Sequence, residues 1–165
     1  MPYLILAALL VLLDQIVKVL VMTHIPLGGH VPFIPHLVEL TYVQNTGAAF
    51  SMLNEHTWLL ALVSLAMSVI LAVALWKNFF RHPLGKTCLT LLLAGAVGNL
   101  IDRTFRHFVV DMFNVLFMNF AVFNVADICV VVGGIAAAVY YLFLADKWEK
   151  GDEGDKTDDN AEADL

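Results

Sequence analysis

The sequence predicts an all-α membrane protein with four transmembrane helices, and three observations lead to this fold class: composition, long apolar runs and the distribution of charge. Of the 165 residues, 60% are hydrophobic, and the mean hydropathy is +0.79. Soluble domains are nearer half apolar. The net charge of −6 arises in residues 151–165, which hold seven acids and one lysine. The rest of the chain is neutral, which argues against a nucleic-acid surface.

Four apolar runs are long enough, or nearly so, to cross a bilayer. A helix needs about 20 residues to span the hydrocarbon core of about 30 Å. The predicted helices cover residues 3–22, 57–76, 84–103 and 125–145. We expect residues 1–146 to form one membrane domain. The acidic tail, 147–165, lacks an apolar period and is expected to be disordered.

Lysine and arginine in the connections predict the orientation of the helices, because cytoplasmic loops carry an excess of both. The connection at 77–86 and the C-terminal end each hold three, and the segment at 103–124 holds two. The segment at 24–56 has neither. Both termini are therefore predicted to be cytoplasmic, with residues 24–56 and 104–124 on the outer side.

The two outer segments do not read as ordinary hydrophilic loops. The first is rich in proline and glycine and then continues as Leu37–Gln44, a stretch of β-forming residues. This pattern predicts a small sheet on the membrane surface. The second, Phe105–Phe123, is too polar to span and too apolar for water, which favours an interfacial or re-entrant segment.

Several ionisable residues fall inside the predicted helices, where each costs about 2.5–3.5 kcal/mol on insertion scales. Asp14 and Lys18 are spaced to share a face of the first helix and to pair. They either set helix packing or support a site, and the sequence leaves both open. Asn99, Asp102 and Arg103 share a face at the end of the third helix. The small residues before them allow a neighbouring helix to approach closely.

Two further carboxylates belong to the outer side. Asp127 lies three residues after Asn124, a spacing typical of a capping box at the start of the fourth helix, and capping is the more common role for that pattern. Asp111 stands in an apolar segment with no helix to cap. Two carboxylates in one partly dry site share a proton, because like charges raise one pKa. An aspartic hydrolase needs this arrangement.

Other chemistries fit the sequence less well. The histidines lack metal-ligand spacing, no cysteine or serine has a histidine and an acid at its depth, and there is no phosphate-binding glycine pattern. A proton- or ion-coupled transporter that uses the same acids remains an alternative. A structural membrane protein with merely paired acids is the third hypothesis.

The chain resembles the lipoprotein signal peptidases (signal peptidase II) in five short motifs that occur in the order of that family. They are Asp14-Gln15-x-x-Lys18, Asn45-Thr46-Gly47-Ala48-Ala49-Phe50-Ser51, Gly98-Asn99-Leu100-Ile101-Asp102-Arg103, Val109-Val110-Asp111 and Phe123-Asn124-x-Ala126-Asp127. The resemblance implies an aspartic endopeptidase of the bacterial inner membrane that cuts prolipoproteins before a cysteine carrying diacylglycerol. It implies no metal and no organic cofactor. It also implies membrane lipid as a partner, and we expect a monomer.

By position, the resemblance implies that Asp111 and Asp127 are the catalytic pair. It implies that the site is lined or braced by Asp14, Lys18, Asn45, Asn99, Asp102, Arg103 and Asn124. A helix N-terminus favours a carboxylate, so we expect Asp127 to be ionised and Asp111 to hold the shared proton. His107 stands where the family usually has glycine, which puts a side chain at a turn that favours φ > 0.

Overall fold

A computed structural model describes residues 2–47 and 57–144 of the chain. The expected disordered tail and part of the second motif lie outside the described residues. The elements, in chain order, are α1 (Pro2–His24), β1 (His30–Ile34), β2 (Val38–Asn45), α2 (Thr57–Trp76), α3 (Pro83–Phe105), β3 (Val109–Val115) and α4 (Val125–Phe143).

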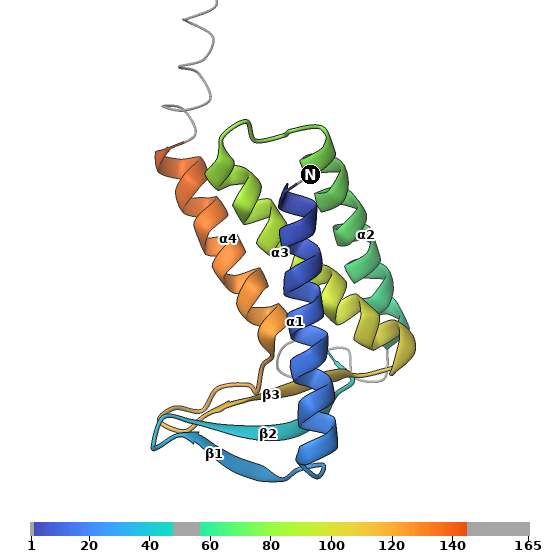
Figure 1. The fold of residues 1–165 in the computed structure, drawn as a ribbon, viewed down its shortest axis with the longest axis vertical. Helices are drawn as coiled ribbons and strands as arrows, with labels where there is room; N and C mark the ends of the chain where they lie inside the picture. The colour runs from blue at the N-terminus through green and yellow to red at the C-terminus, as the bar shows by residue number, and fades with distance from the viewer. Residues whose placement is uncertain (1, 48–56, 145–165) are drawn as a thin grey trace, which may run out of the picture.

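All four predicted transmembrane helices are present. They contain 23, 20, 23 and 19 residues, and each is long and apolar enough to cross a membrane. At 1.5 Å per residue even the shortest covers about 28 Å. The helices run alternately up and down, so that the N-terminus and the α2–α3 connection lie at one end and the sheet lies at the other (Figure 1). The end with the sheet is the one predicted to face outward.

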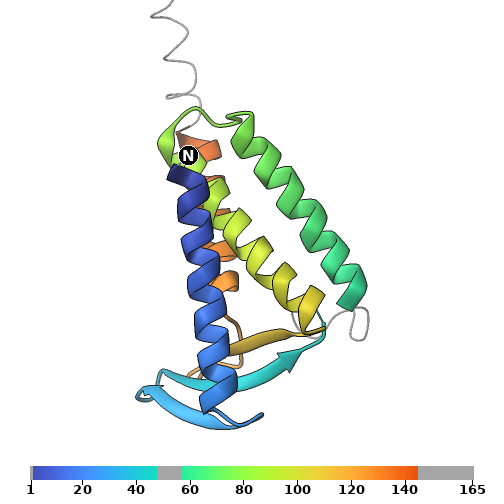
Figure 2. The same cartoon turned by 45° about the vertical axis from the view of Figure 1, so that its right-hand side comes forward.

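Helix α3 is the centre of the bundle. It packs against α1, α2 and α4, whereas α2 has no other packing partner of comparable extent among the described elements. Figure 2 shows α2 standing apart from α1 on the far side of α3. The expected close approach through small residues is confirmed: a Cβ at Gly95 would lie 2.4 Å from the carbonyl oxygen of Ala126 on α4.

The outer segments together form one antiparallel sheet in the order β1-β2-β3. The predicted strand at 37–44 is confirmed as β2. The segment between α3 and α4 supplies the third strand, β3, which its sequence pattern did not indicate. The register pairs Asn45 with Val109 and Val43 with Asp111, and it shifts between Leu40 and Val43.

Strand β3 separates core from cavity through its alternation of side chains, since successive residues of a strand point to opposite faces. Val110 and Met112 are fully buried and pack with Val21 of α1 and with Ile25, the residue that follows this helix. Asp111, between them in sequence, therefore points to the other face. The packing of β3 on α1 thus fixes the direction of the Asp111 carboxylate.

Candidate active site

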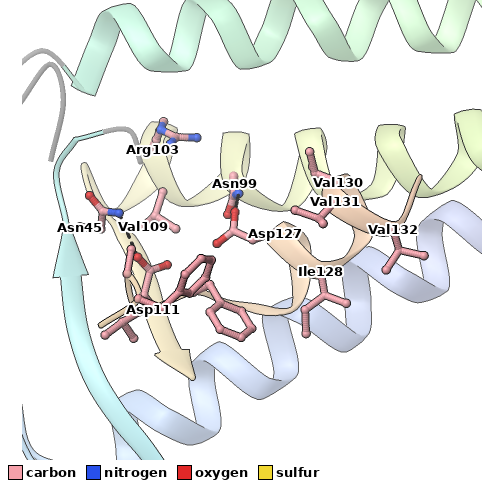
Figure 3. Close-up of a pocket in the computed structure, with 14 residues that line it drawn as sticks. Asn45, Asn99, Arg103, Val109, Asp111, Asp127, Ile128, Val130, Val131 and Val132 are labelled. Carbon is pink, nitrogen blue, oxygen red and sulfur yellow. Dashed lines mark hydrogen bonds between the residues drawn. The ribbon is translucent and has the colours of Figure 1, made fainter. Parts of the chain in front are cut away.

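A cavity of about 430 Å³ opens between the sheet, the outer end of α3 and the start of α4. Its walls are mostly apolar, from Val109, the loop at 120–123 and the first turns of α4. Its polar lining residues are Asn45, Asn99, Arg103, Asp111 and Asp127. These polar side chains come from β2, α3, β3 and α4, and Figure 3 shows them gathered around one space. The cavity therefore brings together both predicted catalytic carboxylates.

Asp111 is 2% exposed and accepts two hydrogen bonds from side-chain amides. Asn45 donates to its Oδ2 at 2.9 Å and Asn124 to its Oδ1 at 2.7 Å. Burial, together with the nearby Asp127 carboxylate, raises the pKa of Asp111 to about 6, against the lowering effect of the two amides and of Lys18. A carboxyl group with this pKa can hold a proton close to neutral pH.

Asp127 occupies the first turn of α4 and completes a capping box with Asn124. The Asn124 side chain accepts a hydrogen bond from the Asp127 backbone N–H at 2.9 Å, and Asp127 Oδ2 accepts one from the Asn124 backbone N–H at 3.1 Å. The other oxygen, Oδ1, accepts a hydrogen bond from Asn99 at 2.8 Å. Capping and lining the cavity are therefore compatible roles for this residue, not alternatives.

A chain of side-chain amides connects the two carboxylates. Asn124 donates to Asp111 and also to Asn99 Oδ1, at 3.3 Å, and Asn99 donates to Asp127. Because an asparagine donates only through its NH₂ group, the direction of each amide follows from what its oxygen accepts.

The side-chain amides of Asn45, Asn99 and Asn124 are each oriented by a donor that binds the amide oxygen. The Asn45 oxygen accepts from the Gly47 backbone N–H at 2.9 Å, and the Asn124 oxygen accepts from the backbone of α4. The Asn99 oxygen accepts from Lys18 Nζ at 3.1 Å. Each NH₂ group is thereby turned toward a carboxylate of the pair.

Lys18 connects the site to a buried network on α1. The ammonium group is fully buried and lies 2.9 Å from both Asp14 Oδ2 and Asp102 Oδ2. Asp14 also accepts from the backbone N–H of Ala126 at 2.9 Å, and Asp102 accepts from that of Val110 at 3.1 Å. The two acids thus brace the start of α4 and strand β3. The pairing of Asp14 with Lys18 serves packing and the site together.

Two members of this network were not identified from the sequence. Gln15 donates to Asp14, to Asp102 and to the Gly98 carbonyl, and it accepts from Arg106. Arg106 also pairs with Asp102. The spacing of Asp102 and Arg106 at i and i+4 on a helix was the available signal. For Gln15, the available signal was its place in the motif Asp14-Gln15-x-x-Lys18.

Arg103 and His107 adjoin the site in different ways. Arg103 lines the cavity, but it diverges from Asp102 and reaches Ser64 on α2, where Nη1 donates at 3.2 Å. His107 has a φ of 65°. The turn before β3 therefore keeps a left-handed backbone although a side chain stands at that position.

Comparison with known proteins gives a consistent result. Residues 6–143 match the family model described as signal peptidase (SPase) II. A lipoprotein signal peptidase of Streptococcus pneumoniae is 45% identical over 140 residues, which are 81% of this chain and 88% of the relative. One of Enterococcus faecalis is 40% identical over 152 residues, 92% and 94% of the two chains.

A solved structure agrees with these sequence relatives. A bacterial membrane enzyme determined by the in meso method at 2.3 Å resolution matches with a TM-score of 0.80 and 27% identity. The match covers 90% of this chain and 91% of that one. Fold, motifs and relatives therefore agree, and the chain belongs to the signal peptidase II family, a family of multi-pass bacterial membrane peptidases.

Proposed function

We propose that this protein is a membrane-embedded aspartic endopeptidase that removes the signal peptide from prolipoproteins, cutting on the N-terminal side of the S-diacylglyceryl cysteine. The observation that carries the proposal is the cavity with two carboxylates, Asp111 and Asp127, joined through amide hydrogen bonds. The substrate comes from the relatives, which are lipoprotein signal peptidases. A transporter, the alternative considered from the sequence, finds no support among them.

The two carboxylates take complementary roles. Asp127, at the positive end of α4, accepts a proton from the attacking water. Asp111 donates its proton to the carbonyl oxygen of the scissile peptide bond, and a tetrahedral diol forms. When the diol collapses, the proton on Asp127 moves to the leaving amine. Asp111 recovers its proton from a diol hydroxyl, so the pair returns to its starting state.

The surroundings of the pair support this assignment. Asp111 is buried, and among the described residues it accepts hydrogen bonds from two neutral amides but from no cation, so that its neutral form is favoured. Asn45, Asn99 and Asn124 hold the carboxylates in place, while Asp14, Lys18 and Asp102 brace the elements that carry them. Arg103 completes the wall. These roles are part of the proposal.

The position of the cavity suits a substrate tethered by lipid. It lies where the sheet meets the ends of α3 and α4 (Figure 1), which is the outer edge of the predicted spans. In the proposed orientation both termini are cytoplasmic and the site faces outward from the inner membrane. The protein acts as a monomer there, surrounded by membrane lipid.

Cleavage of a defined precursor tests the proposal. Purified protein in detergent or lipid is incubated with a diacylglyceryl-modified prolipoprotein, alongside Asp111→Asn and Asp127→Asn. Asparagine keeps the shape of each side chain, and its oxygen can still accept the capping hydrogen bond. Both variants should fold and lose cleavage, whereas Glu39→Gln, at an exposed pair with His30 on the sheet, should cleave normally. A folded wild-type protein that cleaves nothing, or carries ions across liposomes instead, contradicts the proposal.

A further inference from the structure

Arg103 stands beside two acids without pairing with either. It lines the cavity that contains Asp111 and Asp127, yet no ion pair joins it to a carboxylate in the described part of the chain. Its Nε is buried and has no hydrogen-bond partner among the described residues. Arginine near a carboxylate usually forms short, often bidentate bonds. Some other contact must therefore hold the guanidinium away from the acids.

That contact is Ser64 on α2, whose Oγ accepts a hydrogen bond from Arg103 Nη1 at 3.2 Å. Figure 3 shows the guanidinium on the side of α3 that faces α2, whereas Asn99 on the same helix reaches Asp127. Within the described residues, the hydrogen bond from Arg103 to Ser64 is the one polar contact between α2 and α3. Helix α2, which carries Ser64, packs chiefly against α3.

Ser64 differs from the other hydroxyl in the middle of α2. Ser68, one turn further on, donates its hydrogen bond to the Ser64 carbonyl at 2.7 Å and so satisfies itself within its own helix. The Ser64 Oγ instead accepts a hydrogen bond from a neighbouring helix, α3. Around it the helix is apolar, with Val63 and Leu65 about half exposed for contact with lipid. The hydroxyl is thus placed where it meets the guanidinium of Arg103, which borders the cavity.

We propose that Ser64 is a positioning residue, which holds the Arg103 guanidinium on the α2 side of the cavity and apart from Asp111 and Asp127, so that the pair keeps its shared proton. The inference rests on the proposed aspartic mechanism. A free guanidinium would move to the carboxylates and favour the state in which both are ionised. The pair would then lose the proton that it needs to protonate the scissile carbonyl.

The other charges around Asp111 explain why the position of Arg103 matters. Asp127 of α4 disfavours ionisation of Asp111, and Lys18 of α1 favours it from a distance. Lys18 is already balanced by Asp14 and by Asp102 of α3. Strand β2 contributes the neutral Asn45, and α2 contributes a hydroxyl. Arg103 is therefore the cation whose movement can alter the charge balance at the pair.

The pH dependence of cleavage tests the proposal through Ser64→Ala, Ser64→Thr and Ser68→Ala. An opposite charge that comes within about 4–6 Å lowers a carboxyl pKa by about 1–3 units. We expect Ser64→Ala to move the upper limb of the kcat/KM profile to lower pH by about 1 unit, a loss of about tenfold at a fixed pH above the limb. Ser64→Thr should restore the profile, and Ser68→Ala should leave it unchanged.

A second readout separates this inference from the proposed function. Infrared titration of the carboxyl groups, with Asp111→Asn to assign the Asp111 band, follows the proton without any substrate. The Asp111 band should titrate at lower pH in Ser64→Ala than in the wild type. Identical titration curves overturn the role of Ser64, even if cleavage falls. If the wild type cleaves no precursor, the proposed function fails, and the infrared shift still decides where Ser64 holds Arg103.

Discussion

Lys18 on α1 donates a hydrogen bond to the side-chain oxygen of Asn99 on α3 at 3.1 Å, and this bond turns the Asn99 amide NH₂ toward Asp127. A lysine that contacts neither Asp111 nor Asp127 directly thereby sets the direction of a donor at the pair. The same ammonium is buried between two further acids, Asp14 and Asp102. The geometry of the site and the stability of the helix bundle therefore both depend on the Lys18 side chain.

Replacing Lys18 with methionine should reduce stability and cleavage together. Removal of one partner from a buried ion pair leaves uncompensated charge and typically costs about 3–5 kcal/mol. The apparent Tm in detergent and the rate of precursor cleavage measure the two effects. Lys86→Met is the control, since Lys86 lies at the opposite end of α3, over the Tyr3 ring. A Lys18→Met protein of unchanged Tm would contradict the network.

Activity should fall as pH rises through the pKa of Asp111. In the free enzyme this pKa is about 6, and loss of the proton above it removes the acid, so kcat/KM should decline there. Substrate that excludes water from the cavity favours the neutral form further. The decline in kcat should therefore lie at higher pH than that in kcat/KM. Full pH–rate profiles of both constants test this order, and coincident limbs would contradict it.

The free energy of unfolding, like the activity, should fall as pH rises through the pKa of Asp111. Folding raises the pKa of Asp111 from 3.8 to about 6, so the folded protein binds this proton more tightly than the unfolded chain. The stabilisation is complete below the unfolded value and is lost as pH rises through about 6, with a size of about 3 kcal/mol for about two units. Asp111→Asn should flatten the unfolding free energy between pH 4 and pH 7, to about that extent.

Two glycines on facing helices should respond to alanine in opposite ways. At Gly95, a Cβ would meet the Ala126 carbonyl oxygen at 2.4 Å, so α3 and α4 must separate and about 1–3 kcal/mol of stability is lost. At Gly134 the nearest atom, from Leu92, is 3.9 Å away. Alanine there should stabilise α4 by up to about 1 kcal/mol. Equal Tm values for the two variants would contradict the close packing.

His107→Gly should stabilise the turn that leads into β3. A side chain at a φ of 65° strains the backbone, and its removal should gain about 1 kcal/mol. His36→Gly, at a φ of 63° in the turn between β1 and β2, is the matched control. Both should raise the Tm. Since the His107 turn directly precedes the strand that carries Asp111, only that variant is expected to change the cleavage rate as well.

The sequence by itself determined the four helices and the identity of most polar residues at the site. Each transmembrane helix follows from a long run of mostly apolar residues, because a helix that crosses the bilayer needs such a run to match the thickness of the hydrocarbon core. Charged and amide side chains in such spans mark functional positions, because they are costly there without partners. Asp14, Lys18 and Asp102 were found in this way, and Asn124 was found through its capping spacing.

Tertiary structure decided what the polar residues do to one another. Strand β3 was not indicated by its sequence, since its residues Val109–Val115 gain a strand conformation by pairing with β2, which is distant in the chain. The same pairing and the packing on α1 direct Asp111 into the cavity. Gln15, Ser64 and Arg106 join the network through contacts between different helices. Such contacts depend on how the helices pack, which local periodicity does not specify.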